Sequence, residues 1–364
     1  MVRVGVIGCG VVAQVMHLPY LRELSRRFEI GGVCDLSPGT LHAVADRFGV
    51  ERRFTRVEDL LDEPLDAVMV LSSGSHAPPA IAAAERGLHV FVEKPMCLSV
   101  REGRSMIEAA RSAGVVLMVG YMKRYDPAYE RLQAMFAELG DVRFARATTL
   151  ESSGGPYLAH LPLARVDDVP PADMAALRER DDAVIAEAIG EVSDSARRSY
   201  RDVLLASMVH ELNAIRGLLG EPDRLEFAGI RDDGVTVVMD FGGTRCVAAW
   251  VDLPGMARYQ QEWAFFGLDR RARLVFPSPY LHNAPTVLTT EDGESGTVRS
   301  SETVHVESYD EAFRRELIEF HDAITQGREP RTDAADALRD VALCQAVVAQ
   351  HLDGTPRVHP TMTE

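Results

Sequence analysis

Residues 2–13 read VRVGVIGCGVVA, a short and almost wholly apolar run that passes directly into a Gly-x-Gly-x-x-Ala turn. The run Val2–Ile7 is typical of a parallel strand covered on both faces. Glycines at the turn let the backbone bend tightly and approach a pyrophosphate, which the N-terminus of the next helix attracts. The pattern predicts a dinucleotide-binding turn whose cofactor contacts are Gly8, Gly10, Val11, Val12 and Ala13.

The alternation of strand and helix continues through the first 121 residues. Further apolar runs lie at Glu29–Cys34, Ala67–Leu71, His89–Val92 and Val115–Val119, and amphipathic stretches between them at Leu41–Phe48, Pro78–Arg86 and Val100–Ala113. Alternating β and α segments are typical of a doubly wound parallel sheet. We therefore expect an α/β Rossmann domain over residues 1–121.

The pattern changes after Tyr121. The remaining sequence predicts a helix near Pro127–Leu139, a strand at Val142–Leu150, antiparallel strands near 224–230, 235–241, 245–252, 258–266 and 273–276, a helix-rich stretch over Pro171–Gly220, and closing helices at Asp310–Gln326 and Asp333–His351. Turn signals such as Gly242-Gly243 separate several of these strands. We expect an α+β domain over 122–364, with a large, mostly antiparallel open sheet and a helical insert at about 157–203.

Two strand ends supply further candidate cofactor contacts. The second strand ends at Asp35, where a carboxylate would bind ribose hydroxyls and repel a 2′-phosphate, so NAD is favoured over NADP. The alternative for Asp35 is a cap for the following Ser-Pro-Gly turn. Ser72, Ser73 and His76 follow the strand Ala67–Leu71. A resemblance to a known family, carried by motifs such as those at 8–13, 75–95 and 120–129, implies that this loop touches the cofactor, with the serine hydroxyls as candidate contacts. A simple strand-to-helix cap explains the serines equally well.

The segment 89–95, HVFVEKP, ends a buried strand with two charged residues and a proline. Doubly wound folds bind their ligands at this carboxyl edge of the sheet, which makes Glu93 and Lys94 candidate site residues. An exposed ion pair is the alternative. The 39 basic residues comprise only two lysines, Lys94 and Lys123, and therefore 37 arginines. A GC-rich genome explains most of this bias, but a lysine that must release a proton cannot become arginine.

Composition excludes several classes of function. The 364-residue chain has a formal net charge of -16, which argues against nucleic acid or an anionic membrane as its partner. No apolar run reaches membrane-spanning length, and the N-terminus does not resemble a signal peptide, so we expect a cytoplasmic protein. The five cysteines are widely spaced, which predicts reduced, buried thiols and neither a disulfide framework nor a metal site.

Several ordered motifs together resemble the Gfo/Idh/MocA family of sugar and cyclitol oxidoreductases. They are GCGVVA at 8–13, His-Leu-Pro at 17–19, SHAPPAIAAAERGLHVFVEKP at 75–95, GYMKRYDPAY at 120–129, HELNAIRGLLGEP at 210–222 and ELIEFHDAITQGREPR at 316–331. The resemblance covers both predicted domains. It implies a substrate bound between the domains and a homodimer or homotetramer built on the open sheet.

The resemblance also implies roles for individual residues. The position of Lys94 is the usual acid/base residue of the family, and that of Glu93 lies beside the cofactor. A partly desolvated lysine near a cationic nicotinamide releases its proton more readily than an exposed one. His210 matches the family's catalytic histidine, but Ala206 stands where the family has an aspartate and Asn213 where it often has another. These departures remove a carboxylate that would orient His210.

The sequence thus predicts an NAD-dependent dehydrogenase or ketoreductase that acts on a small sugar, sugar derivative or cyclitol. Lys94 is the expected acid/base residue and His210 its assistant, and weaker candidates for substrate binding are Lys123, Arg124, Tyr157, His160 and Asn213. Two alternatives stay open. One is an NAD-dependent glycosidase that uses transient oxidation; the other is a non-catalytic dinucleotide-binding regulator.

Overall fold

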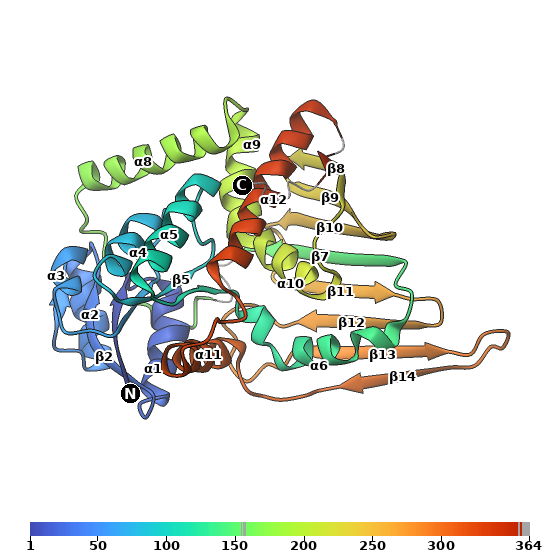
Figure 1. Ribbon diagram of the computed structural model, residues 1–364, viewed down its shortest axis with the longest axis horizontal. Coiled ribbons are helices and arrows are strands. Elements are labelled where there is room, and N and C mark those ends of the chain that lie inside the picture. Colours follow the sequence, from blue (N-terminus) through green and yellow to red (C-terminus); the bar gives the residue numbers. More distant parts are fainter. Residues whose placement is uncertain (154, 156–157, 356, 359–364) are drawn as a thin grey trace. The chain divides into compact units, whose positions relative to one another are not determined.

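The computed structural model describes residues 1–153, 155, 158–355 and 357–358. They form two compact units (Figure 1). The first unit consists of Met1–Tyr121, Leu161–Gly190 and Phe313–Val341, and the second of Met122–His160, Glu191–Ala312 and Ala342–Glu364. The chain therefore passes between the units several times. The division into domains 1–121 and 122–364 stays a prediction.

The first unit is built on a six-stranded parallel sheet with the order β3-β2-β1-β4-β5-β6. Its strands are β1 (Val2–Ile7), β2 (Phe28–Cys34), β3 (Arg53–Phe54), β4 (Ala67–Val70), β5 (His89–Glu93) and β6 (Leu117–Gly120). The strand order reverses direction at β1 and β4. Such a reversal leaves a crevice at the carboxyl ends of the strands, where these folds bind ligands. The predicted doubly wound sheet is confirmed.

Local signals begin and end the helices of the first unit. They are η1 (Ala13–His17), α1 (Leu18–Glu23), α2 (Pro38–Phe48), α3 (Val57–Leu61), α4 (Ala77–Ala84), α5 (Val100–Ala113), α8 (Pro171–Ile189) and α11 (Ala312–Gln326). Ser37 caps α2 by accepting a hydrogen bond from the Thr40 N–H, and Gly49 ends this helix in the left-handed conformation, with φ of +62°. The sequence did not indicate β3 or α3, because two- and five-residue elements are too short for periodicity to appear.

The second unit contains a nine-stranded mixed sheet (Figure 1). In spatial order its strands are β14 (Ser300–His305), β13 (Val287–Gly293), β12 (Arg270–Phe276), β11 (Gln260–Phe266), β7 (Phe144–Ser152), β10 (Thr244–Leu253), β9 (Gly234–Phe241), β8 (Arg224–Arg231) and β15 (Arg357–Val358). Only the pair of β7 with β10 is parallel, so the expected, mostly antiparallel sheet is confirmed. Strands β13, β14 and β15 are additions to the predicted set.

Helices of the second unit pack on this sheet and close its core. They are η2 (Met122–Tyr125), α6 (Pro127–Met135), η3 (Phe136–Leu139), α9 (Asp194–Arg198), η4 (Ser199–Met208) and α10 (Val209–Leu219), while α12 (Ala334–Asp353) begins in the first unit and ends in the second. Helix α6 contacts β12 and β13. Trp263 is fully buried, and its ring centroid lies 4.3 Å from that of Phe276 with the two ring planes tilted by 57°. Nowhere in the described chain does a helix have the length and apolarity needed to cross a bilayer.

Candidate active site

The turn after β1 has the backbone geometry that a dinucleotide requires. Gly8 has a φ of +97°, and a Cβ there would lie 2.5 Å from the backbone N of Ser72, so only glycine fits. A Cβ at Gly10 would meet no atom within 4 Å, which leaves open space beside the turn. Val11 and Val12 begin the following helix and are half-buried. This combination of a tight turn and free space fits a bound pyrophosphate.

Asp35 lies beside this turn at the end of β2. One carboxylate oxygen accepts a 2.7 Å hydrogen bond from the Cys9 N–H, and the other accepts a 2.9 Å bond from the Ser37 N–H. Burial, followed by the charge of Asp35, raises the pKa of the Cys34 thiol to about 12. All five cysteines are free and buried, so their expected burial as thiols is confirmed. Asp35 and the glycine turn therefore share one edge of the sheet.

His76 contacts the backbone of two loops at the carboxyl edge of the sheet. Its ring nitrogens lie 2.6 Å from the carbonyl oxygen of Ser72 and 2.8 Å from that of Pro95. The His76 side chain is buried, whereas Ser72 is half-buried and Ser73 is exposed. His76 thus fixes the loop after β4 against the turn that carries Lys94, while the Ser73 side chain faces solvent.

Glu93, the last residue of β5, is held on both carboxylate oxygens. Its Oε1 lies 2.7 Å from Nε2 of His17, and its Oε2 accepts a 3.0 Å bond from the backbone N–H of Lys94. Burial alone would raise the pKa of Glu93, but the hydrogen bond from His17 and the positive charges of His17, Lys94 and His76 lower it overall. Glu93 therefore stays ionised and fixes the backbone from which the half-buried Lys94 projects.

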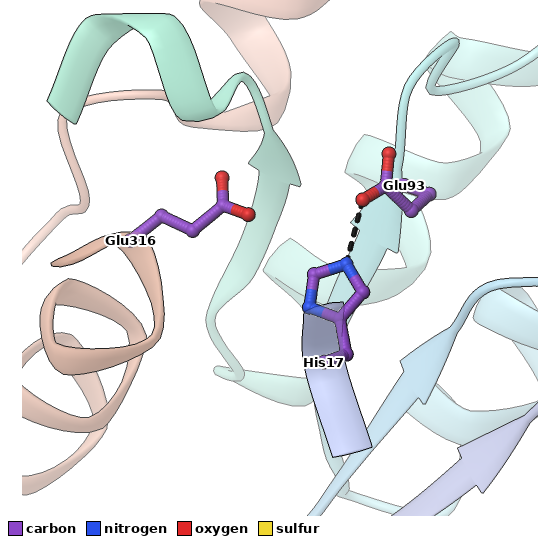
Figure 2. A group of neighbouring side chains, drawn as sticks. All are labelled: His17, Glu93 and Glu316. Carbon is purple, nitrogen blue, oxygen red and sulfur yellow. Dashed lines mark hydrogen bonds and ion pairs between the residues drawn. The ribbon is translucent and has the colours of Figure 1, made fainter. Parts of the chain in front are cut away.

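Glu316, on α11, completes a buried group of three with His17 and Glu93 (Figure 2). Figure 2 shows its carboxylate directed toward the His17–Glu93 pair. Glu316 is 0% exposed, and within the described residues neither of its oxygens has a hydrogen-bond partner. Burial, together with the charge of Glu93, raises its pKa well above 4.5. Two carboxylates here would both be charged only at a large cost, so burial and the charge of Glu93 favour the protonated form of Glu316.

The three side chains also have the residue types of a cation site. Their candidate ligand atoms lie within 4.8 Å of one another. The surroundings are aromatic, however, with the rings of Phe91 and Phe313 at 5.4 and 5.6 Å from the His17 ring. A proton on Glu316 removes the excess charge without the further oxygen ligands that a hard cation needs. No role was predicted from the sequence for His17 or Glu316, although both lie in the motifs of the family resemblance.

We expect His17→Ala to destabilise the protein by about 2 kcal/mol, because it leaves a buried oxygen of Glu93 without its donor. Chemical denaturation at pH 7 measures this loss. His17→Gln supplies an amide donor at the same position and should recover part of the stability. Equal stability of His17→Ala and the wild type would show that the contact with Glu93 contributes nothing.

The sequence-predicted site residues of the second unit differ in burial and in their contacts. His210 is half-buried on α10, and Ala206 is exposed one helical turn earlier in η4. Asn213 is fully buried, and its side-chain oxygen lies 3.3 Å from Nη1 of Arg124. His160 is exposed in a turn, and Tyr157 lies outside the described residues. Asn213 and Arg124 are thus joined by a hydrogen bond.

Lys123 belongs to a buried polar network of the second unit. Its amine contacts the side-chain oxygen of Gln261 and lies 4.0 Å from the centre of the Phe276 ring. The amide nitrogen of Gln261 in turn donates to Glu211 at 2.5 Å, and Glu211 also contacts Thr149. Lys123 is only 8% exposed. Glu211 was not a sequence candidate, because a single glutamate beside His210 carries no signal of burial.

Comparisons with known proteins agree with this geometry. Residues 2–121 match the model of the oxidoreductase family with an NAD-binding Rossmann fold. A D-xylose 1-dehydrogenase (NADP(+)) of Haloferax volcanii is 27% identical over 356 residues, which cover 94% of this chain and 95% of that protein. A scyllo-inositol 2-dehydrogenase (NAD(+)) of Bacillus subtilis is 23% identical over 335 residues, covering 89% and 86%.

A solved structure of levoglucosan dehydrogenase, in complex with NADH and levoglucosan, superposes with a TM-score of 0.77. It is 18% identical and covers 99% of this chain and 100% of its own, so it supports the fold. Fold, glycine turn and relatives together define an NAD(P)-dependent dehydrogenase. The family whose model residues 2–121 match is Gfo/Idh/MocA, which agrees with the resemblance seen in the sequence.

Proposed function

We propose that this dehydrogenase interconverts an alcohol and a ketone at one carbon of a sugar, sugar derivative or cyclitol, with NAD as cofactor and Lys94 as the acid/base residue. The observation that carries the proposal is the fixed backbone of Lys94. Glu93 accepts its N–H at the carboxyl edge of the sheet, and His17 holds Glu93. The relatives named as D-xylose and scyllo-inositol dehydrogenases support the substrate class.

The chemistry needs one group that takes and returns a proton. When an alcohol is oxidised, its O–H bond breaks and the proton moves to the Lys94 amine, while the C–H bond breaks with its electron pair. Bound NAD supplies the acceptor for that hydride, and NADH is the donor in the reverse direction. A neutral amine performs the proton transfer, whereas a guanidinium stays protonated. In this proposal His210 assists the proton transfer.

The turn after β1 and the end of β2 would hold the cofactor. Gly8 and Gly10 allow the close approach of a pyrophosphate, and the half-buried Asp35 offers its carboxylate to the ribose. Glu93 is buried and bound on both oxygens, which makes it a positioning residue for Lys94. The residues at this edge thus divide into cofactor contacts and supports for the proton-transfer group.

One observation favours a second function, a dinucleotide-binding regulator without turnover. Ala206 stands where the family resemblance places a carboxylate that would orient His210. The retention of Lys94 in a chain with 37 arginines and only one other lysine favours catalysis. An NAD-dependent glycosidase would instead turn over glycosides with no net change of NADH.

A panel of sugars, sugar derivatives and cyclitols tests the proposal by following NADH absorbance, with NADPH in parallel. We expect at least one substrate to be turned over with NADH. Binding of NADH without turnover of any panel member would favour the regulator. The predicted cytoplasmic location and the homodimer or homotetramer are separate proposals, which fractionation and light scattering of the purified chain would test.

A further inference from the structure

Residues 161–190, which we call the strap, run along the cofactor edge of the first unit. Gln14, in the helix after the glycine turn, exchanges two 2.9 Å hydrogen bonds with the backbone of Ala164. Near the end of the strap, Asp181 accepts a 3.3 Å bond from the Ser75 N–H, and Arg101 pairs with Glu187 at 2.5 Å. The strap therefore touches the loops after β1 and β4, which flank the expected cofactor position.

Between these contacts the strap reaches the N-terminus of α2. Asp168 accepts a 2.7 Å bond from the Gly39 N–H with one carboxylate oxygen, and its other oxygen contacts the Ser37 hydroxyl. The Val166 N–H donates to the Thr40 hydroxyl at 3.0 Å. The bonds from Ser37 and Gly39 lower the pKa of Asp168, so its carboxylate is charged at neutral pH. A negative charge from the strap thus occupies a helix N-terminus.

Helix α2 begins at Pro38, three residues after Asp35. In a doubly wound fold, the acid at the end of the second strand binds the ribose 2′-hydroxyl of NAD, and the 2′-phosphate of NADP would require donors or an arginine nearby. The hydroxyl of Ser37 and the N–H of Gly39 are the donors that such a phosphate would use. Both of these donors already form hydrogen bonds to the carboxylate of Asp168. A phosphate would therefore meet charge repulsion where NADP enzymes offer hydrogen bonds.

We infer that Asp168 is a specificity-determining residue, which together with Asp35 excludes NADP from the cofactor site. The inference rests on the proposed function, because it assumes that the first unit binds a nicotinamide dinucleotide. It concerns a residue 131 positions away from Ser37 in the sequence, in a segment that is not part of the Rossmann sheet. The relatives include both an NADP(+) and an NAD(+) enzyme, so this choice varies among similar proteins.

The test compares Asp168→Asn and Asp168→Ala with the wild type. Dissociation constants of NADH and NADPH are measured by calorimetric titration of the full chain, without any substrate. We expect the wild type to bind NADH at least about a hundredfold more tightly than NADPH. Both variants should bind NADPH about tenfold more tightly than the wild type does, with NADH affinity nearly unchanged. Asp167→Asn is the matched control, because it removes the same charge one residue away and should change neither constant.

Gly39→Ala is a second, independent way to remove the contact of Asp168 with the N-terminus of α2. A Cβ at Gly39 would lie 2.8 Å from a carboxylate oxygen of Asp168 and 2.7 Å from the Val166 side chain, so it displaces the strap without altering any charge. We expect NADPH affinity to rise in this variant too. Thermal melts establish that each variant is folded.

The possible outcomes separate this inference from the proposed function. If the wild type binds neither NADH nor NADPH, the proposed function fails. If it binds NADH but both Asp168 variants keep the wild-type preference, the inference about Asp168 is wrong and the proposed function stands. Equal binding of both cofactors by the wild type also overturns the inference. Parallel losses of NADH and NADPH in the Asp168 variants would assign Asp168 a structural role only, and so contradict it.

Discussion

We expect Lys94→Ala to lower kcat about a thousandfold on any substrate that the wild type oxidises, because one positioned acid/base residue contributes roughly 10² to 10⁴ in rate. The loss should lie in kcat rather than in cofactor affinity. Glu93 accepts a hydrogen bond from the Lys94 backbone N–H, and truncation of the Lys94 side chain keeps this bond. Steady-state kinetics together with NADH titration measure the two effects separately.

Lys94→Arg is the matched control for charge. It keeps a cation at the carboxyl edge of the sheet but cannot release a proton near neutral pH, so we expect it to be as inactive as the alanine variant. Full activity of Lys94→Arg would mean that position 94 supplies only a positive charge. Full activity of Lys94→Ala would remove Lys94 from the mechanism altogether.

Glu316→Gln is expected to stabilise the protein, increasingly so as the pH rises above about 4.5. Burial and the charge of Glu93 raise the pKa of Glu316 in the folded protein. Above its ordinary value of 4.5 the unfolded chain has therefore lost a proton that the folded chain retains, and stability falls as the pH rises. One such proton gives a slope of about 1.4 kcal/mol per pH unit. Glutamine has no proton to lose, so the variant lacks this slope.

Glu319, one turn along the same helix, is a control whose pKa is shifted in the opposite direction. Its hydrogen bond from Arg328 lowers its pKa, so its contribution is present at neutral pH and is lost as the pH falls through the lowered value. Glu319→Gln should thus destabilise at pH 7 and converge with the wild type in acid. Urea denaturation of the wild type and both variants between about pH 3 and 9 distinguishes the two glutamates.

Parallel stability curves for the wild type and Glu316→Gln would mean that Glu316 is ionised in the folded protein. A chelator that then lowers the melting temperature of the wild type, but not of Glu316→Gln, would indicate a cation bound by His17, Glu93 and Glu316. Either result would contradict the assignment of a proton to Glu316.

Features encoded by neighbouring residues could be predicted before the structure was known. The strand Val2–Ile7 and the glycine turn after it follow from apolar runs and from the conformational freedom of glycine, which are properties of short segments. The position of Lys94 follows from the end of a buried strand. Strand β14 was not predicted, because its residues Ser300–His305 are nearly all exposed and show no apolar alternation.

A doubly wound dinucleotide fold with a lysine at the carboxyl edge of its sheet is predictable from the residues alone, because hydrophobic period and turn chemistry act over a few residues. The approach of Glu316 to His17 and Glu93, and the contact of Asp168 with Ser37, are visible only in the folded chain. These side chains come from distant segments, so their burial and charge pairing exist only once the chain has folded. No local sequence pattern predicts the raised pKa of Glu316 or the contact of Asp168 with Ser37.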